Sequence, residues 1–265
     1  MPTQARYRGF TLIEMLLVIS LIALLISMLL PALGKSRQSA RAAWCGSNQR
    51  QLVEALTMYA DLANYYPAGL DAAPNNNDRI WLWPPQLRRF TDRDQRIFHC
   101  PQAPASTEWD YRTTPGEPAF FGYDENETRI RGYTYKFSYG YNVWGAFMVQ
   151  NPNTGLGVYR NHPYLDAARV AAVKNPSDMV AFADSNPNDF WSGFIGPYRT
   201  GQWPSRMHMG NPNVAFVDMH VEIVDRTELV DVVLNRESNQ RWNNDHQPHL
   251  LNTGTIQNDG VPEFP

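Results

Sequence analysis

The pattern of hydrophobic and polar positions begins with one long apolar run near the N-terminus. Residues 10–33 contain a single acid, Glu14, and no lysine or arginine. A helix of this length would be about 36 Å long, which is enough for a hydrocarbon core of about 30 Å. We therefore expect residues 10–33 to form a membrane-spanning helix.

Beyond the apolar run the pattern becomes one-sided. Leu52, Leu56, Tyr59 and Ala63 recur at helical spacing, while the basic residues of this stretch fall on other faces. Tyr66-Pro67 is expected to end the pattern, because proline cannot continue a helix. The sequence therefore predicts one continuous helix over residues 10–65 and a globular head over residues 66–265.

The head shows strand patterns rather than long helices. Aromatic residues alternate with other residues between 132 and 149, and residues 179–183 form a short apolar run. Residues 213–217 and 220–224 flank Asp218-Met219, a pattern that indicates a hairpin. We expect an α+β fold with the long helix packed on an antiparallel sheet, and a loose, asparagine-rich tail from about residue 235.

The aromatic strand has two interpretations. The side chains concerned are Tyr133, Tyr135, Phe137, Tyr139 and Tyr141. We expect them to form a sheet face that packs on the helix, and the alternative is an exposed aromatic strip that binds carbohydrate.

Composition and charge exclude several classes of function. The formal net charge is −3 and 43% of the residues are hydrophobic, so a core is expected and a nucleic-acid partner is not. The chain has no phosphate-binding glycine loop, no Gly-x-Ser-x-Gly turn and no His-Glu-x-x-His motif. We therefore expect a protein that is not an enzyme.

Glu14 is the unusual residue of the apolar run. A charged side chain at the centre of a bilayer costs about 2.5–3.5 kcal/mol, so its presence indicates a partner for the charge. An ordinary signal anchor does not need this acid. A cleaved secretory signal has a shorter apolar core, of about 7–15 residues, and residues 31–34 match its cleavage site poorly.

The segment Arg8-Gly9-Phe10-Thr11-Leu12-Ile13-Glu14 resembles the leader and cleavage site of type IV prepilins and type II secretion pseudopilins. The resemblance implies that residues 1–9 are a leader, that a prepilin peptidase cuts between Gly9 and Phe10, and that Phe10 is methylated. It also implies that Glu14 pairs with the N-terminal ammonium of a neighbouring subunit.

The function implied by this resemblance is that of a structural subunit of a type IV pilus-like filament or a type II secretion pseudopilus. The implied partners are the peptidase, other pilin subunits, the inner-membrane assembly machinery and lipid. Basic residues flank the apolar run on both sides, so charge alone does not orient it. The resemblance implies a single-pass inner-membrane protein with a periplasmic head. The alternative is a minor pilin or adhesin whose head binds a glycan or a metal.

The chain has two cysteines, Cys45 and Cys100. Outside the inner membrane they would meet oxidising conditions, so we expect a disulfide between them. Closing a loop of this length stabilises a fold by about 4 kcal/mol in the chain-entropy model. The alternative is two buried free thiols.

The C-terminal part carries a second resemblance. His208, Asp218 and His220-Val221 are similar to a pattern of planctomycete prepilin-like proteins, in which a histidine is followed after nine residues by Asp-Gly and usually His-Val. This chain has Met219 in place of the glycine. A type I′ turn needs positive φ at both central residues, which costs methionine about 1–2 kcal/mol.

Two histidines and two carboxylates in this region could hold a divalent metal. Asp184, His208, Asp218 and His220 would suit zinc if they converge. Calcium would instead take the two aspartates and carbonyl oxygens. The alternatives are a histidine that hydrogen-bonds to an aspartate and holds a loop at the hairpin, and a membrane-anchored metalloenzyme that uses His208 and Asp218.

Overall fold

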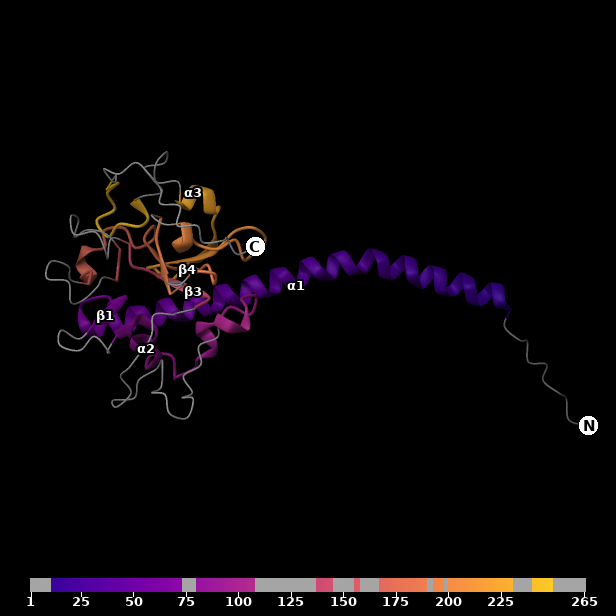
Figure 1. The fold of residues 1–265 in the computed structure, drawn as a ribbon, viewed down its shortest axis with the longest axis horizontal. Helices are drawn as coiled ribbons and strands as arrows, with labels where there is room; N and C mark the ends of the chain where they lie inside the picture. The colour runs from indigo at the N-terminus through magenta and orange to yellow at the C-terminus, as the bar shows by residue number, and fades with distance from the viewer. Residues whose placement is uncertain are drawn as a thin grey trace, which may run out of the picture. The chain divides into compact units, whose positions relative to one another are not determined.

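The computed structural model describes residues 11–72, 80–107, 137–144, 155–157, 167–189, 193–197, 200–230 and 240–249. The chain divides into two compact units, residues 1–40 and residues 41–265, and each is described by itself. Figure 1 shows the elements in chain order.

The predicted long helix is confirmed. Helix α1 (Leu12–Ala63) is continuous and includes Pro31 without ending there. It ends at Asn64, whose φ of 63° is the left-handed conformation that often follows the last turn of a helix. Helix α1 therefore ends a little before Tyr66-Pro67, where the sequence predicts its end. Phe10 lies outside the described residues.

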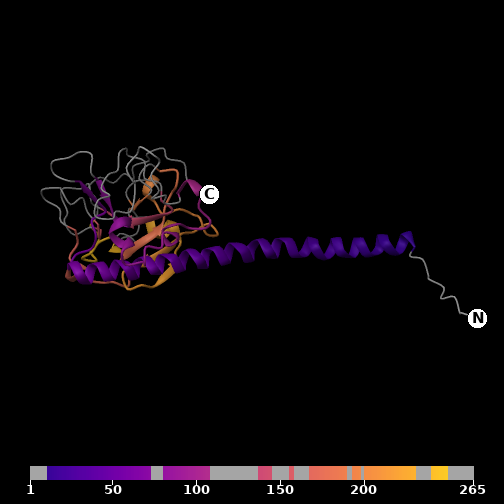
Figure 2. The same cartoon turned by 90° about the horizontal axis from the view of Figure 1, so that it is seen from below.

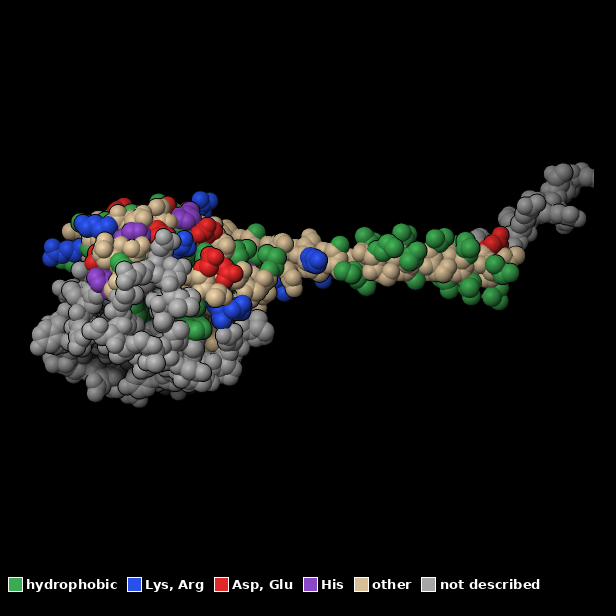
Figure 3. Space-filling model, turned by 90° about the horizontal axis from the view of Figure 1, so that it is seen from above, with side chains coloured by type: hydrophobic (Ala, Val, Ile, Leu, Met, Phe, Trp, Pro, Cys, Tyr) green, Lys and Arg blue, Asp and Glu red, His purple; other side chains and the backbone are tan. Residues whose placement is uncertain are grey.

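The first unit consists, in its described part, of the N-terminal portion of α1. Every described side chain from Thr11 to Ala40 is exposed, and most of those up to Leu33 are apolar. Figure 3 shows hydrophobic side chains over the surface of this portion. Such a surface is unfavourable in water, so it needs lipid or other apolar helices around it.

The head contains a five-stranded sheet with the order β5-β3-β4-β6-β7. The strands are β3 (Tyr139–Asn142), β4 (Val180–Asp184), β5 (Phe194–Ile195), β6 (Asn213–Phe216) and β7 (Val221–Ile223). All neighbours are antiparallel except β3 and β5, which are parallel. The α+β class is confirmed, but the expectation of a wholly antiparallel sheet needs correction. Strand β5 lies on the far side of β3 from β4 and runs parallel to β3.

Short elements complete the described part of the head. They are β1 (Leu70–Ala72), β2 (Ile80–Leu82), α2 (Trp83–Arg88), α3 (Arg226–Val230) and 3-10 turns at Arg96–Phe98, Ala105–Thr107, Val170–Ala172 and Thr200–Gln202. Among the described residues, strands β1 and β2 pair only with each other, as an antiparallel two-stranded sheet.

One face of the main sheet packs on α1 within the head unit, as Figures 1 and 2 show. Leu52 and Leu56 of the helix share a core with Tyr139, Tyr141 and aromatic neighbours from other elements. Tyr139 and Tyr141 are fully buried, which confirms the interpretation of the aromatic strand as a packing face in the described residues. Tyr133 and Tyr135 lie outside the described residues.

The other face of the sheet is covered by α3 and by residues 240–249. Trp242 is fully buried there, and its indole N–H donates to the carbonyl of Leu229 over 2.9 Å. The expectation of a loose tail from about residue 235 is therefore wrong for residues 240–249. Trp242 buries a large apolar area, and hydrogen bonds from the Val180 N–H to the Arg241 carbonyl and from the Trp144 indole to Asn243 also hold this polar segment on the sheet.

Candidate functional site

The start of α1 carries a reciprocal cap between Thr11 and Glu14. The backbone N–H and the hydroxyl of Thr11 both donate to Glu14 Oε2 over 2.8 Å, and the Glu14 N–H donates to Thr11 Oγ1 over 3.3 Å. This is the capping box that Thr-x-x-Glu favours before an apolar run. The spacing Thr11-x-x-Glu14 is the sequence signal for this cap, which gives the acid a partner within its own chain. Gly9 lies outside the described residues, as Phe10 does.

The structure joins Cys45 of α1 to Cys100, which follows the 3-10 turn Arg96–Phe98. The two sulfurs are 2.16 Å apart, and both side chains are fully buried. The disulfide therefore links α1 covalently to the segment before the sheet, close to the point where the helix enters the head unit.

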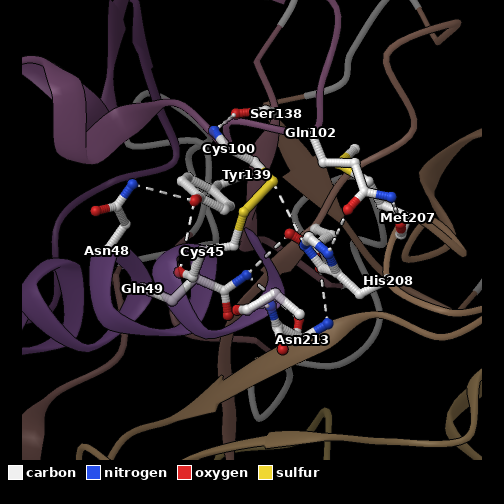
Figure 4. A network of polar contacts seen from close by, with 12 residues as sticks. Cys45, Asn48, Gln49, Cys100, Gln102, Ser138, Tyr139, Met207, His208 and Asn213 are labelled. Atoms are coloured by element: carbon white, nitrogen blue, oxygen red, sulfur yellow. Dashed lines mark hydrogen bonds and ion pairs between the residues drawn. A yellow bond between two sulfur atoms is a disulfide. The ribbon is translucent and has the colours of Figure 1, made fainter. Parts of the chain in front are cut away.

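His208 lies against this disulfide. Its Nε2 is 3.4 Å from Cys100 Sγ and 3.3 Å from Asp184 Oδ2, and its Nδ1 is 3.2 Å from Gln102 Oε1. The amide of Gln102 donates to the Met207 carbonyl, so its oxygen is left to accept from the Nδ1–H. Figure 4 shows the imidazole between Gln102 and the disulfide.

Asp184, the last residue of β4, has a fully buried carboxylate. Burial raises the pKa of this carboxyl above its ordinary value, while His208, the Asn213 N–H and the Gln49 amide act in the opposite direction. The Asn213 N–H donates to Oδ2 over 2.7 Å, and Gln49 Nε2 donates to Oδ1 over 3.2 Å. Both oxygens therefore have donors, as a buried carboxylate requires.

Side-chain amides extend these contacts along α1. Asn48 donates to the His99 carbonyl over 3.0 Å, and the Asn213 side chain donates to the Ala42 carbonyl over 3.0 Å. Sequence reasoning missed Asn48, Gln49, Gln102 and Asn213 as members of this site. The available signal was two adjacent amides, Asn48 and Gln49, on the face of α1 that helical spacing otherwise fills with apolar residues.

The structure does not bring the four predicted metal ligands together. His208 and Asp184 lie at the end of β6 that begins with Asn213, whereas Asp218 and His220 pair with each other in the β6–β7 turn. The length of β6, at about 3.3 Å per residue, separates the two pairs. A single zinc or calcium site made from all four residues, and the calcium site using Asp184 and Asp218, are therefore wrong.

The β6–β7 turn also explains the position of Met219. Its loop has three residues, since the Met219 N–H donates to the Phe216 carbonyl and the Phe216 N–H donates to the His220 carbonyl, both over 3.0 Å. This is the type I turn followed by a left-handed residue, rather than the expected type I′ turn. Only Met219 in this loop has positive φ, at 75°. Glycine is favoured at this one position because methionine costs about 1–2 kcal/mol there.

Three observations bear on the family of the chain. Helix α1 is long and apolar enough, by length and composition, to cross a membrane. The chain matches no curated protein and no solved structure. Residues 4–30 match the family model described as the prokaryotic N-terminal methylation motif. This match supports a type IV pilin-like protein, and in the part of the chain that the structure describes α1 is the one helix long and apolar enough to serve as its membrane anchor.

Proposed function

We propose that the protein is a structural, non-enzymatic subunit of a type IV pilus-like filament or a type II secretion pseudopilus. The observation that carries the proposal is the continuity between the methylation motif at residues 4–30 and α1. The first part of that helix exposes apolar side chains on every side, which is the surface that a helix needs in lipid and in a filament core.

In this proposal a prepilin peptidase removes residues 1–9 and methylates Phe10. The chain then waits in the inner membrane with its head in the periplasm until the assembly machinery adds it to other subunits. The disulfide between Cys45 and Cys100 supports this location, because such bonds persist in the periplasm and are rare in the cytosol.

Glu14 sets the register between subunits in the proposed filament. The carboxylate bonds to Thr11 of its own chain, so it has a local partner before assembly. Cleavage would place a new ammonium at Phe10, and the ammonium of a neighbouring subunit would replace the Thr11 donors. An ion pair in such a low-dielectric interior is strong and depends steeply on distance, so it favours one axial position.

The proposal is tested first on the membrane-extracted protein, by intact mass and N-terminal sequencing. A mature chain that starts at N-methyl-Phe10 is expected. A chain that still starts at Met1, or one cut near Ala32, contradicts processing by the peptidase.

The assembly step is tested with Glu14→Gln, which keeps the shape of the side chain and removes its charge. We expect normal cleavage and loss of the protein from the sheared filament fraction. Glu54→Gln is the matched control, since Glu54 is an exposed acid on the same helix within the head unit and should leave assembly unchanged. Normal incorporation of the Glu14→Gln protein would contradict the role of Glu14.

The head adds support of a second kind. Residues 208–221 resemble the C-terminal pattern of planctomycete prepilin-like proteins, and the left-handed Met219 is where that pattern has its glycine. The ligand-binding alternative gains no support from the described aromatic strand, because Tyr139 and Tyr141 are buried. We therefore propose a structural role for the head.

A further inference from the structure

We propose that the head binds a zinc ion when the Cys45–Cys100 disulfide is reduced to two thiols (the dithiol form). The ligands would be Cys45, Cys100, His208 and Asp184, and formation of the disulfide would release the ion. This inference concerns the head alone. It does not depend on cleavage, methylation or filament assembly.

The positions of the donor atoms carry the proposal. The two sulfurs and one ring nitrogen of His208 all lie within 4.8 Å of one another and are buried. His208 Nε2 is 3.4 Å from Cys100 Sγ and 3.3 Å from Asp184 Oδ2. Ligand atoms around tetrahedral zinc, with bonds of about 2.0–2.3 Å, lie about 3.3–3.8 Å apart. Both distances from Nε2 fit this geometry. The two sulfurs must move apart, which reduction allows, and the Asp184 carboxylate must approach them, since it lies outside the group of three donors within 4.8 Å of one another.

The groups behind these donors already hold them in the orientation that a metal needs. The Nδ1–H of His208 donates to Gln102 Oε1, which holds the ring with Nε2 facing the Cys100 sulfur and the Asp184 carboxylate, where a metal would bind. The Gln49 amide and the Asn213 N–H hold the Asp184 carboxylate. Outer hydrogen bonds of this kind orient first-shell ligands and raise their affinity for the metal.

The chemistry of the donor set selects the ion. Two thiolates and an imidazole are soft or intermediate donors, which suit zinc and disfavour calcium. The set supplies four protein ligands, and a closed four-ligand site is typical of zinc that stabilises a fold rather than zinc that catalyses a reaction. The buried position of all four side chains is consistent with such a structural ion.

The two states are connected by a balanced exchange. Zinc binding to the dithiol displaces the two thiol protons and leaves two thiolates on the metal. Oxidation passes two electrons from these thiolates to a disulfide oxidant, which takes up two protons and becomes two thiols. The Cys45–Cys100 bond then forms, and the zinc ion leaves because the two sulfurs are no longer thiolates.

The test uses the full-length chain in detergent, reduced with a phosphine that is removed without admitting oxygen. Cobalt(II) is the probe, since thiolate ligation gives it a charge-transfer band and a tetrahedral d–d spectrum. We expect one cobalt ion per reduced chain, displaced by zinc, and none in the oxidised chain. The oxidised chain is a control that needs no substitution.

Variants locate the site. Cys45→Ser or Cys100→Ser should lower the intensity of the thiolate-to-cobalt charge-transfer band by about half, because one of the two thiolate ligands is lost. Gln102→Leu should weaken cobalt binding by about 10–100-fold while leaving the band shape intact. The double variant Asp218→Asn, His220→Gln is the matched control. It removes an exposed histidine–aspartate pair and should leave binding unchanged.

Three results would overturn the proposal. They are a reduced chain without a thiolate band, equal binding by the reduced and oxidised chains, and equal binding by the cysteine variants and the parent. If reduction alone unfolds the head, added zinc must restore the circular dichroism of the oxidised protein. Failure to restore it, together with an absent band, would also refute the site.

Discussion

His208 shows how much one buried side chain can hold in place. It lies between the Gln102 amide and the Asp184 carboxylate, and the side chains of the histidine and the aspartate are fully buried. Removing one partner of such a pair leaves the other buried group without that hydrogen-bond partner. The free energy of unfolding then falls by more than the intact contact contributes.

The first prediction concerns this pair. We expect His208→Ala to lower the free energy of unfolding of the head by about 3–5 kcal/mol, because the buried Asp184 carboxyl would lose the imidazole that partners its Oδ2. His220→Ala is the control, since the side chain of His220 is 40% exposed and its ion pair with Asp218 should contribute less than about 1 kcal/mol. Denaturant unfolding of both variants measures the difference, and equal losses would contradict the prediction.

The elements of the head differ in how readily the sequence predicts them. Strands β4, β6 and β7 follow from apolar runs and turn residues that are local in the sequence. Strand β5, with only Phe194 and Ile195, is too short to show a period, and its parallel pairing with β3 depends on the whole sheet. The same limit applies to the site. The nine-residue spacing of His208 and Asp218 predicts that the two residues belong to one metal site. In the structure β6 lies between them, so they are located at opposite ends of that strand.

The pairing of β3 with β5 gives the second prediction. A Cβ on Gly140 would clash with Ile195 Cγ2 and lie 3.1 Å from the Phe194 carbonyl carbon, so Gly140→Ala requires the Ile195 side chain and the neighbouring β5 backbone to shift. We expect a loss of about 1–3 kcal/mol, which is typical of overpacking. Gly46→Ala is the matched control. Its Cβ would meet only Val221 Cγ1, at 3.5 Å, and alanine in a helix gains about 0.5–1 kcal/mol over glycine.

These two glycine variants are compared by thermal melting of the full chain. A Gly140→Ala protein as stable as the parent would show that β5 does not approach β3 so closely.

At the scale of the whole molecule, buried phenols make the fold sensitive to alkali. Burial, with the negative charge of Asp61 nearby, raises the pKa of Tyr66 to about 12 from 10.0. Burial also raises the pKa of Tyr139 and Tyr141 well above the ordinary value. The folded protein therefore holds these protons more tightly than the unfolded chain does.

The third prediction follows from the sign of this difference. Stability should be fully present below pH 10 and should be lost as the pH rises from 10 toward about 12, because the unfolded chain ionises first. The melting temperature and the tyrosinate absorbance, followed together, should change together. Tyr66→Phe should move the loss of stability to higher pH. Full ionisation of the tyrosines near pH 10 in a head that stays folded would contradict the burial of these phenols.

The position of the disulfide on α1 has a mechanical consequence. Ala42 and Cys45 are the first buried side chains of the helix, so a pull along the proposed filament reaches the head at this point. Non-covalent contacts loaded from one end open one after another, and each needs only a small force. The disulfide, three residues after Ala42, passes the load to Cys100 before the packing contacts farther along α1 are strained. The helix therefore cannot be pulled away from Cys100 without breaking a covalent bond, although each packing contact behind it is weak.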